Sequence, residues 1–527
     1  MGNWAAAEQA SSKMNRAFYV TTPIYYISGN PHIGHVYTTV VADVLARTAR
    51  TAGPAFFLTG TDEHGQKVAN AAAEHGVTPA QWCDELVPRW QSLFAAYHVD
   101  YDDFIRTTQA RHEIKVQRVF ERLRESGDVY LGKYEGWYCV NDETFWPESK
   151  LVDGRCPTCG REVQWISEDD WFFRLSAYRD RLLAHFKSSA QWVRPRSVYN
   201  EMVALLEEGL DDLSISRTNF DWGIPIPEGP STGSGQAVIY VWFDALLNYI
   251  TAIDWSENEA RFRSLWPASV QLIGKEIARF HTIIWPAILW ALGEAAPELV
   301  FAHGWITIDG QKMGKSLGNA VDPFALADRF GADSVRYFLL REAPFGSDFS
   351  YSEEKIAQRH NSDLGNDLGN LLRRTLSMLE KYREGVVPVR SASSPFAQRF
   401  ESLPARVRGL ILALDFRAAL EAVWELVTVL NREIDERKPW TLAKDGRERE
   451  LDALLYDLCE GLRWLAMLLH PFMPERTAAM WTQLGLQEDI ASNWSTALRW
   501  GGLAPGTQTS AGDVLFPRIE LAESASA

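Results

Sequence analysis

Two short segments combine residue types that could bind a phosphate chain. In the first, His32 and His35 lie one helical turn apart at the start of a predicted helix, behind a predicted buried strand at 16–26. Asn30 is expected to cap this helix and Pro31 to occupy its first position. A helix N-terminus presents unpaired N–H groups and a positive dipole end, so two imidazoles there would favour an anion. Taken alone, the pattern also fits a simple cap with two solvent-facing histidines.

The second segment is a glycine-rich loop with two lysines three positions apart, Lys312 and Lys315. Asp309 and Gly310 precede it and predict a hairpin turn, because alternating apolar residues flank them. Lysines on a flexible loop could follow the charge that develops on a phosphate chain and then leaves with it. A solvated lysine loop is the alternative at this point.

The composition limits the classes of protein to which the chain can belong. Its 527 residues are enough for roughly three to four domains of about 150 residues each. With 46% hydrophobic residues the chain can form packed cores. The 53 Lys and Arg residues against 69 Asp and Glu give a net charge of −16, which disfavours a general nucleic-acid coat but allows a local basic surface. Five cysteines do not suggest a disulfide framework, and we expect Cys83 and Cys459 to lie in helical cores.

The sequence contains no apparent targeting or membrane-spanning segment. No apolar run approaches the ~20 residues that a transmembrane helix requires. The longest run, 283–292, contains Pro286 and is interpreted as a buried helix. Residues 1–15 lack the apolar core of a signal peptide, so a flexible tail is expected there. The sequence therefore favours a cytoplasmic protein without membrane association.

Alternating strand and helix patterns predict how the candidate residues are positioned. After the first strand and helix, 56–58 is predicted to be a buried strand, 59–65 a polar loop and 66–74 a helix that ends at Gly76. Repeated units of this kind form a parallel sheet whose ligands lie at the carboxyl ends of the strands. The charged residues of the loop would then face the same crevice as the two histidines: Asp62, Glu63 and His64.

The pattern changes twice further along the chain. From about 132 to 236, short aromatic strands, prolines and three of the cysteines predict an inserted module. Strand–helix alternation resumes in 237–250 and 269–293, so one sheet domain is split by the insertion. Beyond residue 322, long amphipathic segments run to about residue 484 and predict a helix bundle.

Both candidate phosphate-binding segments belong to a series of motifs that occur in one order. His-Ile-Gly-His stands at 32–35 and Lys-Met-Gly-Lys-Ser at 312–316. The accompanying motifs are TTPIYY, TGTDEHG, YEGWYC, YVWFDAL, IGKEI, FAHGW, NDLGNLL and KPW. With these motifs the chain resembles the methionyl-tRNA synthetase family of class I aminoacyl-tRNA synthetases, from residue 16 to about residue 484.

The resemblance implies a two-step reaction. L-Methionine and ATP, with Mg²⁺, would form methionyl-adenylate and pyrophosphate, and methionine would then pass to the 3′-terminal adenosine of tRNA(Met), initiator tRNA included. The substrate carboxylate is itself the nucleophile, so the protein would act by positioning and by stabilising phosphate charge. This chemistry would explain why histidines stand at a helix N-terminus and lysines on a loop.

The resemblance also assigns residues to each ligand. The catalytic group would be His32, His35, Lys312 and Lys315, and further contacts to ATP would come from Gly34, Gly274 and Glu276. Asp62 would pair with the methionine ammonium, and the rest of the pocket would be Ile24, Tyr26, Trp242, Ala245, Leu246, Tyr249, Ile277 and His281. Aromatic walls suit a polarizable thioether, and Tyr26 and His281 could place a weak donor near its sulfur. The anticodon would be bound by Asn370, Arg374, Pro439 and Trp440.

The implied fold is α/β. A Rossmann-type parallel-sheet catalytic domain would be split by a connective insertion with a zinc-knuckle-like motif, and an all-α anticodon-binding bundle would follow. The expected bounds are a tail at 1–15, catalytic halves at 16–131 and 237–321, the insertion at 132–236, a stem-contact linker at 322–350, the bundle at 351–490 and a second tail at 491–527. Because no dimerisation domain follows residue 527, a monomer is expected.

Two positions depart from the family pattern. Gly314 stands where the second signature usually has serine, which removes a hydroxyl and loosens the loop. Glu276 stands where an aspartate is usual, and its extra methylene leaves its contact open. We expect activity nevertheless, because Lys315 is retained.

The insertion carries a candidate metal site. Cys139-x-x-Asp142 and Cys156-x-x-Cys159 have the spacing of a zinc knuckle in which a carboxylate replaces one thiolate. A structural zinc and a metal-free knuckle held by packing both remain open at this stage. Three alternatives for the whole chain also remain: a synthetase for another amino acid, a nucleotidyl transferase that does not use tRNA, and a non-catalytic RNA-binding protein.

Overall fold

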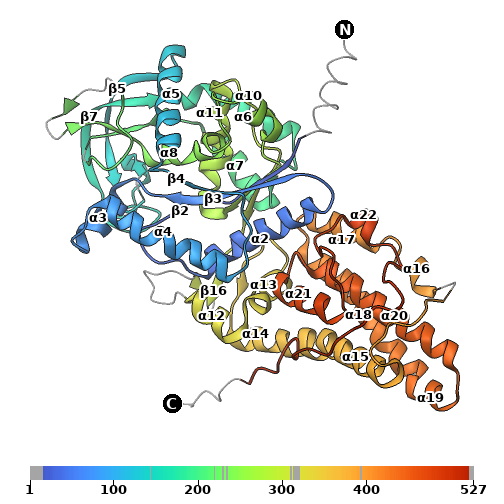
Figure 1. Ribbon diagram of the computed structural model, residues 1–527. Coiled ribbons are helices and arrows are strands. Elements are labelled where there is room, and N and C mark those ends of the chain that lie inside the picture. Colours follow the sequence, from blue (N-terminus) through green and yellow to red (C-terminus); the bar gives the residue numbers. More distant parts are fainter. Residues whose placement is uncertain are drawn as a thin grey trace, which may run out of the picture. The chain divides into compact units, whose positions relative to one another are not determined.

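The computed structural model describes the chain at residues 16–142, 144–218, 220–227, 231–232, 235–308, 311–312, 321–391 and 394–520. The chain divides into two compact units, which Figure 1 colours along the sequence. The first, here called the sheet unit, comprises Met1–Pro31, Phe56–Ser92 and Tyr101–His303. The second, the bundle unit, comprises His32–Ala55, Leu93–Asp100 and Gly304–Ala527. Among the helices of the described residues, none has both the length and the apolar character needed to cross a bilayer.

The sheet unit is built around a seven-stranded sheet. The strand order is β2 (Tyr25–Tyr26), β3 (Ala55–Asp62), β1 (Phe18–Thr21), β14 (Val270–Gly274), β15 (Val300–His303) and β8 (Val193–Arg194), and β4 (Asp103–Arg106) also pairs with β3. Strands β2 and β4 are parallel to β3, β1 and β15 are parallel to β14, and β8 is parallel to β15. The predicted parallel α/β architecture is therefore confirmed.

Two of the predicted strand bounds were wrong. The segment 16–26 forms two strands, because Pro23 lies between them and has no N–H to donate to a ladder. Strand β3 continues through Asp62, so most of the predicted loop at 59–65 belongs to the sheet. These residues stay in the sheet because Thr59 to Thr61 pair with β4 and Asp62 pairs with β2. The approach of β4 is so close that a Cβ on Gly60 would meet the carbonyl oxygen of Ile105 at 2.0 Å.

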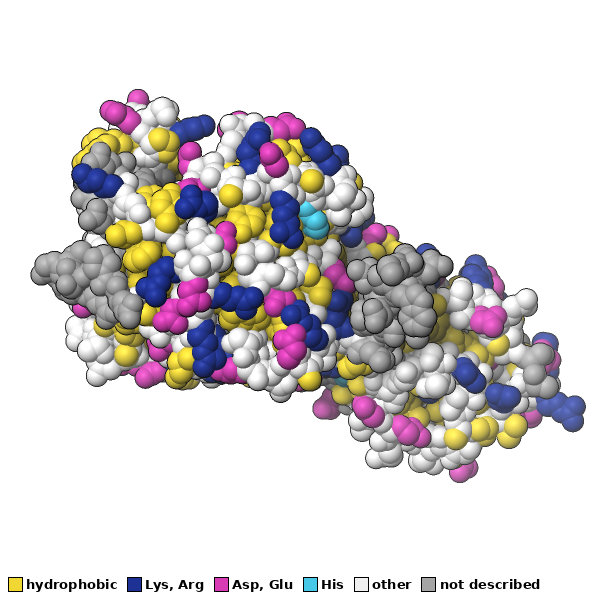
Figure 2. Space-filling model, turned by 90° about the horizontal axis from the view of Figure 1, so that it is seen from above, with side chains coloured by type: hydrophobic (Ala, Val, Ile, Leu, Met, Phe, Trp, Pro, Cys, Tyr) yellow, Lys and Arg dark blue, Asp and Glu magenta, His cyan; other side chains and the backbone are white. Residues whose placement is uncertain are grey.

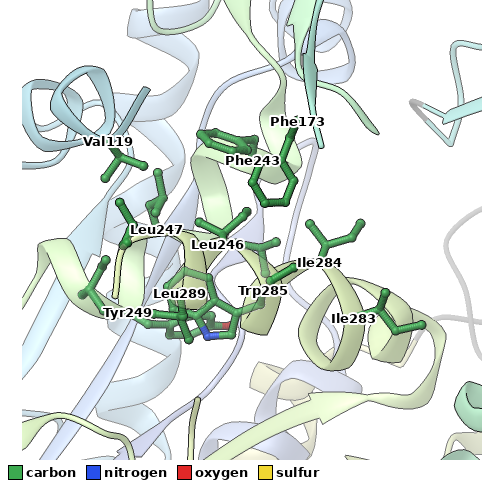
Figure 3. Packing of buried hydrophobic residues seen from close by; sticks show 14 of the residues in the cluster. Val119, Phe173, Phe243, Leu246, Leu247, Tyr249, Ile283, Ile284, Trp285 and Leu289 are labelled. Atoms are coloured by element: carbon green, nitrogen blue, oxygen red, sulfur yellow. The ribbon is translucent and has the colours of Figure 1, made fainter. Parts of the chain in front are cut away.

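Helices pack around the large sheet. In chain order they are α3 (Gln66–Glu74), α4 (Pro79–Ala96), α5 (Ala110–Ser126), α6 (Arg179–Ser188), α7 (Arg196–Glu208), α8 (Val241–Leu246), α9 (Asn248–Thr251), α10 (Glu259–Leu265) and α11 (Trp285–Ala291), with a π-helical turn at Phe280–Ile284 before α11. The predicted helix at 66–74 and the buried helix around Pro286 are confirmed. Figure 3 shows the core, in which Leu246 and Tyr249 lie close to the buried Trp285.

The inserted module is an antiparallel sheet of order β6-β5-β7-β9. Its strands are β5 (Val129–Cys139), β6 (Thr144–Trp146), β7 (Gln164–Phe173) and β9 (Leu213–Ser214). Two short antiparallel pairs follow, formed by β10 (Ser216–Arg217) with β13 (Val238–Ile239) and by β11 (Ser231–Thr232) with β12 (Gly235–Gln236). The range expected for the insertion, 132–236, also contains β8, which pairs in the large sheet. Strand β13 pairs with β10 and does not rejoin that sheet.

The bundle unit is helical, as predicted for the chain beyond residue 322. It contains α2 (Ile33–Arg50), α12 (Pro323–Phe330), α13 (Ala332–Arg341), α14 (Glu353–Arg359), a π-helical segment (His360–Gly369), α15 (Asn370–Arg383), α16 (Pro395–Arg399), α17 (Leu403–Leu412), α18 (Phe416–Arg437), α19 (Pro439–Lys444), α20 (Glu448–Leu469), α21 (Pro474–Gln483) and α22 (Trp494–Ala497). A small sheet of β16 (Ile306–Ile308), β17 (Gln311–Lys312) and β18 (Phe349–Ser350) precedes most of these helices. Cys83 on α4 and Cys459 on α20 are buried, as expected.

Charged side chains of both signs are interspersed over the face shown in Figure 2. This mixture agrees with a chain that is acidic overall but rich in arginine and lysine. A chain with a net charge of −16 does not produce a positive field over its whole surface. Any binding of a nucleic acid therefore has to come from particular side chains.

Candidate functional site

Asp62 lies at the carboxyl end of β3, beside Tyr26 at the end of β2. It is buried, with 6% of its surface exposed. The next residue, Glu63, is also buried, and its carboxylate accepts hydrogen bonds of 2.6–3.0 Å from Thr61 Oγ1, Thr108 Oγ1 and Arg106 Nε and Nη2. These bonds fix the backbone next to Asp62, so its carboxylate is preorganised for a partner.

Helix α8 carries the aromatic side chain Trp242, which forms one wall of the site with Phe280. The ring of Trp242 stacks on that of Phe280, with centroids 3.9 Å apart and an interplanar angle of 10°. Ala245, Leu246 and Tyr249 follow in the same segment and are almost completely buried. Burial raises the pKa of Tyr249, and the negative charge of Asp62 raises it further.

His281 connects this wall to the π-helical turn. Its Nδ1–H donates to the carbonyl oxygen of Ile277 at 3.1 Å, and its Nε2 accepts from the Tyr249 hydroxyl at 2.7 Å. Burial lowers the pKa of His281 to about 4, so the ring is neutral. Both ring nitrogens are thus engaged within the protein, and a donor near sulfur from His281 stays a prediction that requires the exchange of one of these bonds. Tyr26 keeps that candidate role.

The end of β14 completes this edge of the sheet. A Cβ on Gly274 would lie 2.7 Å from a carboxylate oxygen of Glu276, so the glutamate folds back over the glycine. The longer side chain of Glu276 fits because Gly274 has no side chain. Ile24 and Ile277 pack partly buried against the core. Asp62, Tyr26 and Gly274 thus lie at the carboxyl ends of β3, β2 and β14, and Tyr249 on α9 is joined to His281 beyond β14.

The two signature histidines begin α2 in the bundle unit. His32 is the N-cap: its Nδ1 accepts from Gly34 N–H at 3.1 Å, and its own N–H donates to His35 Nδ1 at 3.0 Å. The prediction of Asn30 as cap and Pro31 as first helical residue was wrong, because the His32 and His35 imidazoles accept the backbone N–H groups of Gly34 and His32 in a capping box. The two rings stack with centroids 3.7 Å apart. Since each Nδ1 accepts, each neutral ring carries its proton on Nε2.

Gly34 has a local role in this cap. A Cβ at this position would approach the His32 ring to 2.9 Å, which real side chains do not tolerate. The glycine therefore lets the ring fold over the first turn, in addition to any room that it leaves for a nucleotide.

The second signature is described only in part. Ile308 pairs with Gln311 and Thr307 with Lys312 in an antiparallel ladder, as a hairpin requires. The turn residues Asp309 and Gly310, and also Gly314 and Lys315, lie outside the described residues.

The four knuckle residues converge. Cys139 Sγ lies 3.5 Å from Cys159 Sγ, and Cys156 Sγ lies 2.9 Å from Asp142 Oδ2. All four candidate ligand atoms lie within 4.8 Å of one another. Three sulfurs and one carboxylate at this spacing fit tetrahedral zinc, whose bonds to sulfur are about 2.3 Å long. The cluster could therefore hold a structural zinc ion.

The expected anticodon residues lie along α15 and at the α18–α19 junction. Asn370 begins α15, and Arg374 Nη2 forms an ion pair of 2.6 Å with Asp435 Oδ1 near the end of α18. Lys438 has a left-handed conformation, with φ 47°, and separates the two helices at the junction. Pro439 is buried after it, whereas Trp440 is 49% exposed. A large aromatic side chain exposed at a helix junction is suited to stacking on an unpaired base.

Sequence reasoning missed one central residue, Asp244 on α8. It is fully buried and bridges His64 and His112. A signal was present, because Asp244 is a lone charged residue in the apolar stretch YVWFDALL, and a buried charge requires partners.

A split parallel sheet followed by a helical bundle, with these two signatures, defines a class I aminoacyl-tRNA synthetase. A family profile described as "tRNA synthetases class I (M)" matches residues 18–165 and 159–376, and one described as "Anticodon binding domain of methionyl tRNA ligase" matches residues 392–526. The chain belongs to the methionyl-tRNA synthetase family.

Individual relatives are similar over most of the chain. The methionine–tRNA ligase of Caldanaerobacter subterraneus subsp. tengcongensis is 50% identical over 515 residues, covering 96% of this chain and 80% of the relative. That of Halalkalibacterium halodurans is 45% identical, covering 97% and 80%. The structure of Mycobacterium tuberculosis methionyl-tRNA synthetase in complex with methionyl-adenylate is 42% identical, with a TM-score of 0.89, 95% of this chain covered and 100% of that chain. The apo form of the same enzyme gives a TM-score of 0.84 at 38% identity, with 96% and 99% covered.

Proposed function

We propose that the chain is a methionine–tRNA ligase. It activates L-methionine with ATP and transfers the methionyl group to the 3′-terminal adenosine of tRNA(Met), initiator tRNA included. The observation that carries this proposal is the similarity, over nearly the whole chain, to a synthetase that holds methionyl-adenylate. The side chains at the carboxyl ends of β2 and β3 support it, because they suit an ammonium beside a thioether.

Methionine is held by its ammonium and its side chain. The buried Asp62 carboxylate pairs with the ammonium, and such a pair is stronger away from water than at the surface. The stacked Trp242 forms a wall for the polarizable thioether, with Tyr26 as the candidate donor to sulfur. The pocket is completed by Ile24, Ala245, Leu246, Tyr249, Ile277 and His281.

Activation needs charge stabilisation and no general base. A carboxylate oxygen of methionine attacks the α-phosphorus of ATP, and the bond from that phosphorus to the pyrophosphate oxygen breaks. His32 and His35 offer N–H groups at a helix N-terminus to the phosphates, and Lys312 and Lys315 bind the β- and γ-phosphates. Mg²⁺ accompanies the nucleotide. The adenosine contacts are assigned to Gly34, Gly274 and Glu276.

The bundle unit recognises the anticodon of tRNA. Trp440 supplies a stacking surface at the α18–α19 junction. Asn370 and Arg374 on α15 supply hydrogen-bonding groups for unpaired bases, and Pro439 orients the tryptophan. Arg374 must exchange its ion pair with Asp435 for the RNA when it binds.

Two further properties complete the proposal. We expect a monomer, with a mass near 59.6 kDa by light scattering. A mass of twice that value would contradict the monomer. We expect the activity in the cytoplasm, where ATP and tRNA are available.

The decisive experiment is pyrophosphate exchange into ATP with each of the twenty amino acids. Methionine should support exchange far above the others. Comparable exchange with leucine or cysteine would overturn the substrate assignment, and exchange without any subsequent charging of tRNA would favour tRNA-independent nucleotidyl transfer.

A pair of variants sharpens this assay. Asp62→Ala removes the proposed ammonium partner and should raise the KM for methionine by about a hundredfold or more. Asp180→Ala removes an aspartate whose side chain is 92% exposed, and it should leave the KM unchanged. Equal effects of the two substitutions would contradict the role of Asp62.

A further inference from the structure

Asp244 joins three separate elements of the sheet unit through buried hydrogen bonds. Its Oδ2 lies 2.7 Å from His64 Nδ1 and its Oδ1 lies 2.6 Å from His112 Nε2. His64 follows β3, His112 lies on α5 and Asp244 lies on α8. Asp244 and His112 are 0% exposed, and His64 is 3% exposed.

The chemistry of the cluster fixes which atoms carry protons. An ionised carboxylate only accepts hydrogen bonds, so His64 Nδ1 and His112 Nε2 both donate to Asp244. His112 Nδ1 then accepts from the Thr251 hydroxyl on α9 at 2.7 Å. His64 Nε2 lies 3.7 Å from the Glu113 carboxylate, so this imidazole stands between two acidic groups. Although burial alone would raise it, the pKa of Asp244 is lowered by His64 and His112.

The position of the cluster relates it to the proposed methionine pocket. His64 comes two residues after Asp62, and Asp244 comes two residues after Trp242. Trp222 closes the other side of the loop, because its Nε1–H donates to the carbonyl oxygen of Glu63 at 2.6 Å and its ring packs edge-on against His64. The bond between His64 and Asp244 therefore connects the backbone that presents the ammonium partner to the helix that presents the thioether wall.

We propose that Asp244 is a positioning residue for methionine. It does not touch the amino acid. Through His64 it holds the end of β3, which carries Asp62, at one fixed distance from α8, so that the ammonium and the thioether of one methionine can be bound together. This inference rests on the proposed function, because it concerns the same pocket.

The test compares substitutions in pyrophosphate exchange. Asp244→Asn keeps the size of the side chain, but the amide cannot accept hydrogen bonds from both imidazoles. Asp62 and Trp242 should then no longer be held at a fixed distance from each other. The KM for methionine should rise at least about tenfold, whereas kcat and the KM for ATP should change by less than about threefold, since misplacement by a fraction of an ångström weakens one ligand selectively.

His64 provides a rescue experiment that does not depend on the folding of the first variant. His64→Leu removes the donor to Asp244 and should raise the methionine KM in the same way. His64→Asn places an amide N–H near the former Nδ1 and should restore the KM to within about threefold of the parent value.

Asp170→Asn is the matched control. Asp170 is also a buried aspartate of the sheet unit, but it accepts hydrogen bonds from Ser214 and Ser216 of the inserted module. Its replacement should lower thermal stability without a selective change in the methionine KM.

Three outcomes would overturn the inference. One is an unchanged methionine KM in both Asp244→Asn and His64→Leu. Another is a fall in kcat in proportion to the folded fraction, without a selective rise in the KM for methionine. The third is a methionine KM that is raised in His64→Asn as much as in His64→Leu. A parent protein without methionine-dependent exchange would overturn the proposed function instead, before any variant is made.

Discussion

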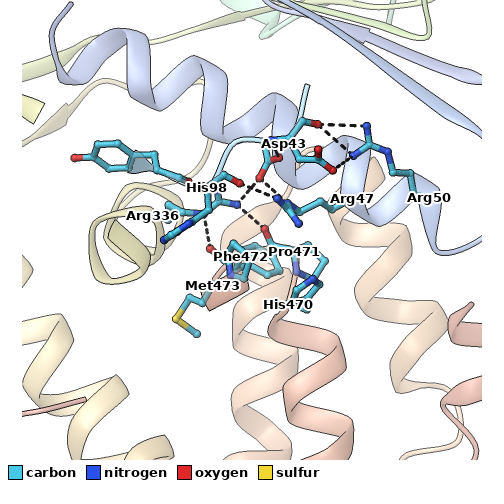
Figure 4. A network of polar contacts seen from close by, with 12 residues as sticks. Asp43, Arg47, Arg50, His98, Arg336, His470, Pro471, Phe472 and Met473 are labelled. Atoms are coloured by element: carbon cyan, nitrogen blue, oxygen red, sulfur yellow. Dashed lines mark hydrogen bonds and ion pairs between the residues drawn. The ribbon is translucent and has the colours of Figure 1, made fainter. Parts of the chain in front are cut away.

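Arg336 and Asp43 form an ion pair in which neither side chain is exposed to solvent, with Nη2 and Oδ2 2.6 Å apart (Figure 4). The guanidinium also donates to three carbonyl oxygens, those of Tyr97, Pro471 and Phe472. Asp43 lies on α2 and Arg336 on α13, and Pro471 and Phe472 follow α20. Within the bundle unit, this arginine thus connects the helix that carries the signature histidines to α13 and to the chain that follows α20.

Loss of this arginine should be costly. Arg336→Met leaves Asp43 buried without its main partner and should lower the free energy of unfolding by about 3–5 kcal/mol. Arg406→Met is the control, because Arg406 forms a bidentate but half-exposed pair with Glu425, and its loss should cost less than about 1 kcal/mol. Thermal and urea unfolding compare the two. Equal losses would mean that the buried ion pair of Arg336 contributes no more to the free energy of unfolding than the exposed pair of Arg406.

Asp333, also on α13, should make stability depend on pH. Its Oδ2 accepts from Arg476 N–H at 2.7 Å, whereas its buried Oδ1 has no hydrogen-bond partner among the described residues. Burial raises its pKa from 3.8 to about 6. The group therefore contributes stability that is fully present below about pH 3.8 and is lost as the pH rises through 6, at most about 3 kcal/mol.

The substitution Asp333→Asn removes this charge and keeps an acceptor for Arg476. Its melting temperature should exceed that of the parent at pH 7.5, and the difference should shrink towards pH 4.5. The control Asp415→Asn replaces an exposed helix cap and should change stability little at either pH. A constant difference across the pH range would rule out Asp333 as the titrating group.

Trp440 should matter for tRNA and not for adenylate formation. If it stacks on an anticodon base, Trp440→Ala loses ~1–3 kcal/mol of tRNA recognition, or about ten- to a hundredfold in kcat/KM for aminoacylation. Arg374→Ala should behave alike. Pyrophosphate exchange needs no tRNA and should barely change in either variant.

Val389→Ala serves as the control for this pair, because Val389 is another exposed apolar side chain of the bundle unit, at 73% exposure. It should leave both assays unchanged. A loss in exchange that equals the loss in aminoacylation would instead identify Trp440 as a residue needed for the fold.

Metal analysis should find up to one zinc per chain, bound by the knuckle. Cys156→Ser removes a thiolate and should abolish any zinc that the parent holds. Cys459→Ala, a cysteine buried on α20, should retain it. A second metal per chain, or catalytic loss in proportion to zinc loss while the fold is intact, would contradict a single structural ion.

Lys315→Ala tests the second signature. Lost stabilisation of the phosphate charge should lower kcat for activation by roughly a hundredfold or more, with little change in the methionine KM. Lys150→Ala, whose side chain is 62% exposed in the insertion, is the control. A defect confined to methionine binding would refute a phosphate role for Lys315.

Much of the architecture follows from patterns that are local in the sequence. The helix at 66–74 has the predicted bounds, because its residues are amphipathic and Gly76 adopts a positive φ of 71° behind it. The knuckle residues converge because both of their pairs have the spacing of ligands on tight turns. The family motifs supplied the remaining site residues.

The predictions from the sequence are wrong or incomplete where residues distant in the sequence determine the local structure. Thr59 to Asp62 look like a loop by composition, but Thr59 to Thr61 pair with β4 and Asp62 pairs with β2. Asn30 is the better cap by propensity, yet two stacked imidazoles take its place. The partners of Asp244 lie 180 and 132 residues away, so no local pattern identifies them. These interactions depend on the sheet topology.

Strand β1 receives one of its neighbours from the far end of the sheet unit. Tyr19 N–H donates to Ser269 Oγ at 3.2 Å, across a separation of 250 residues. A ribosome that adds roughly 5–20 residues per second needs about 12–50 s to deliver this partner. During that time one edge of β1 stays open, and an open strand edge is a template for pairing with other chains. Biosynthesis therefore passes through an interval of aggregation risk that ends only when β14 leaves the ribosome.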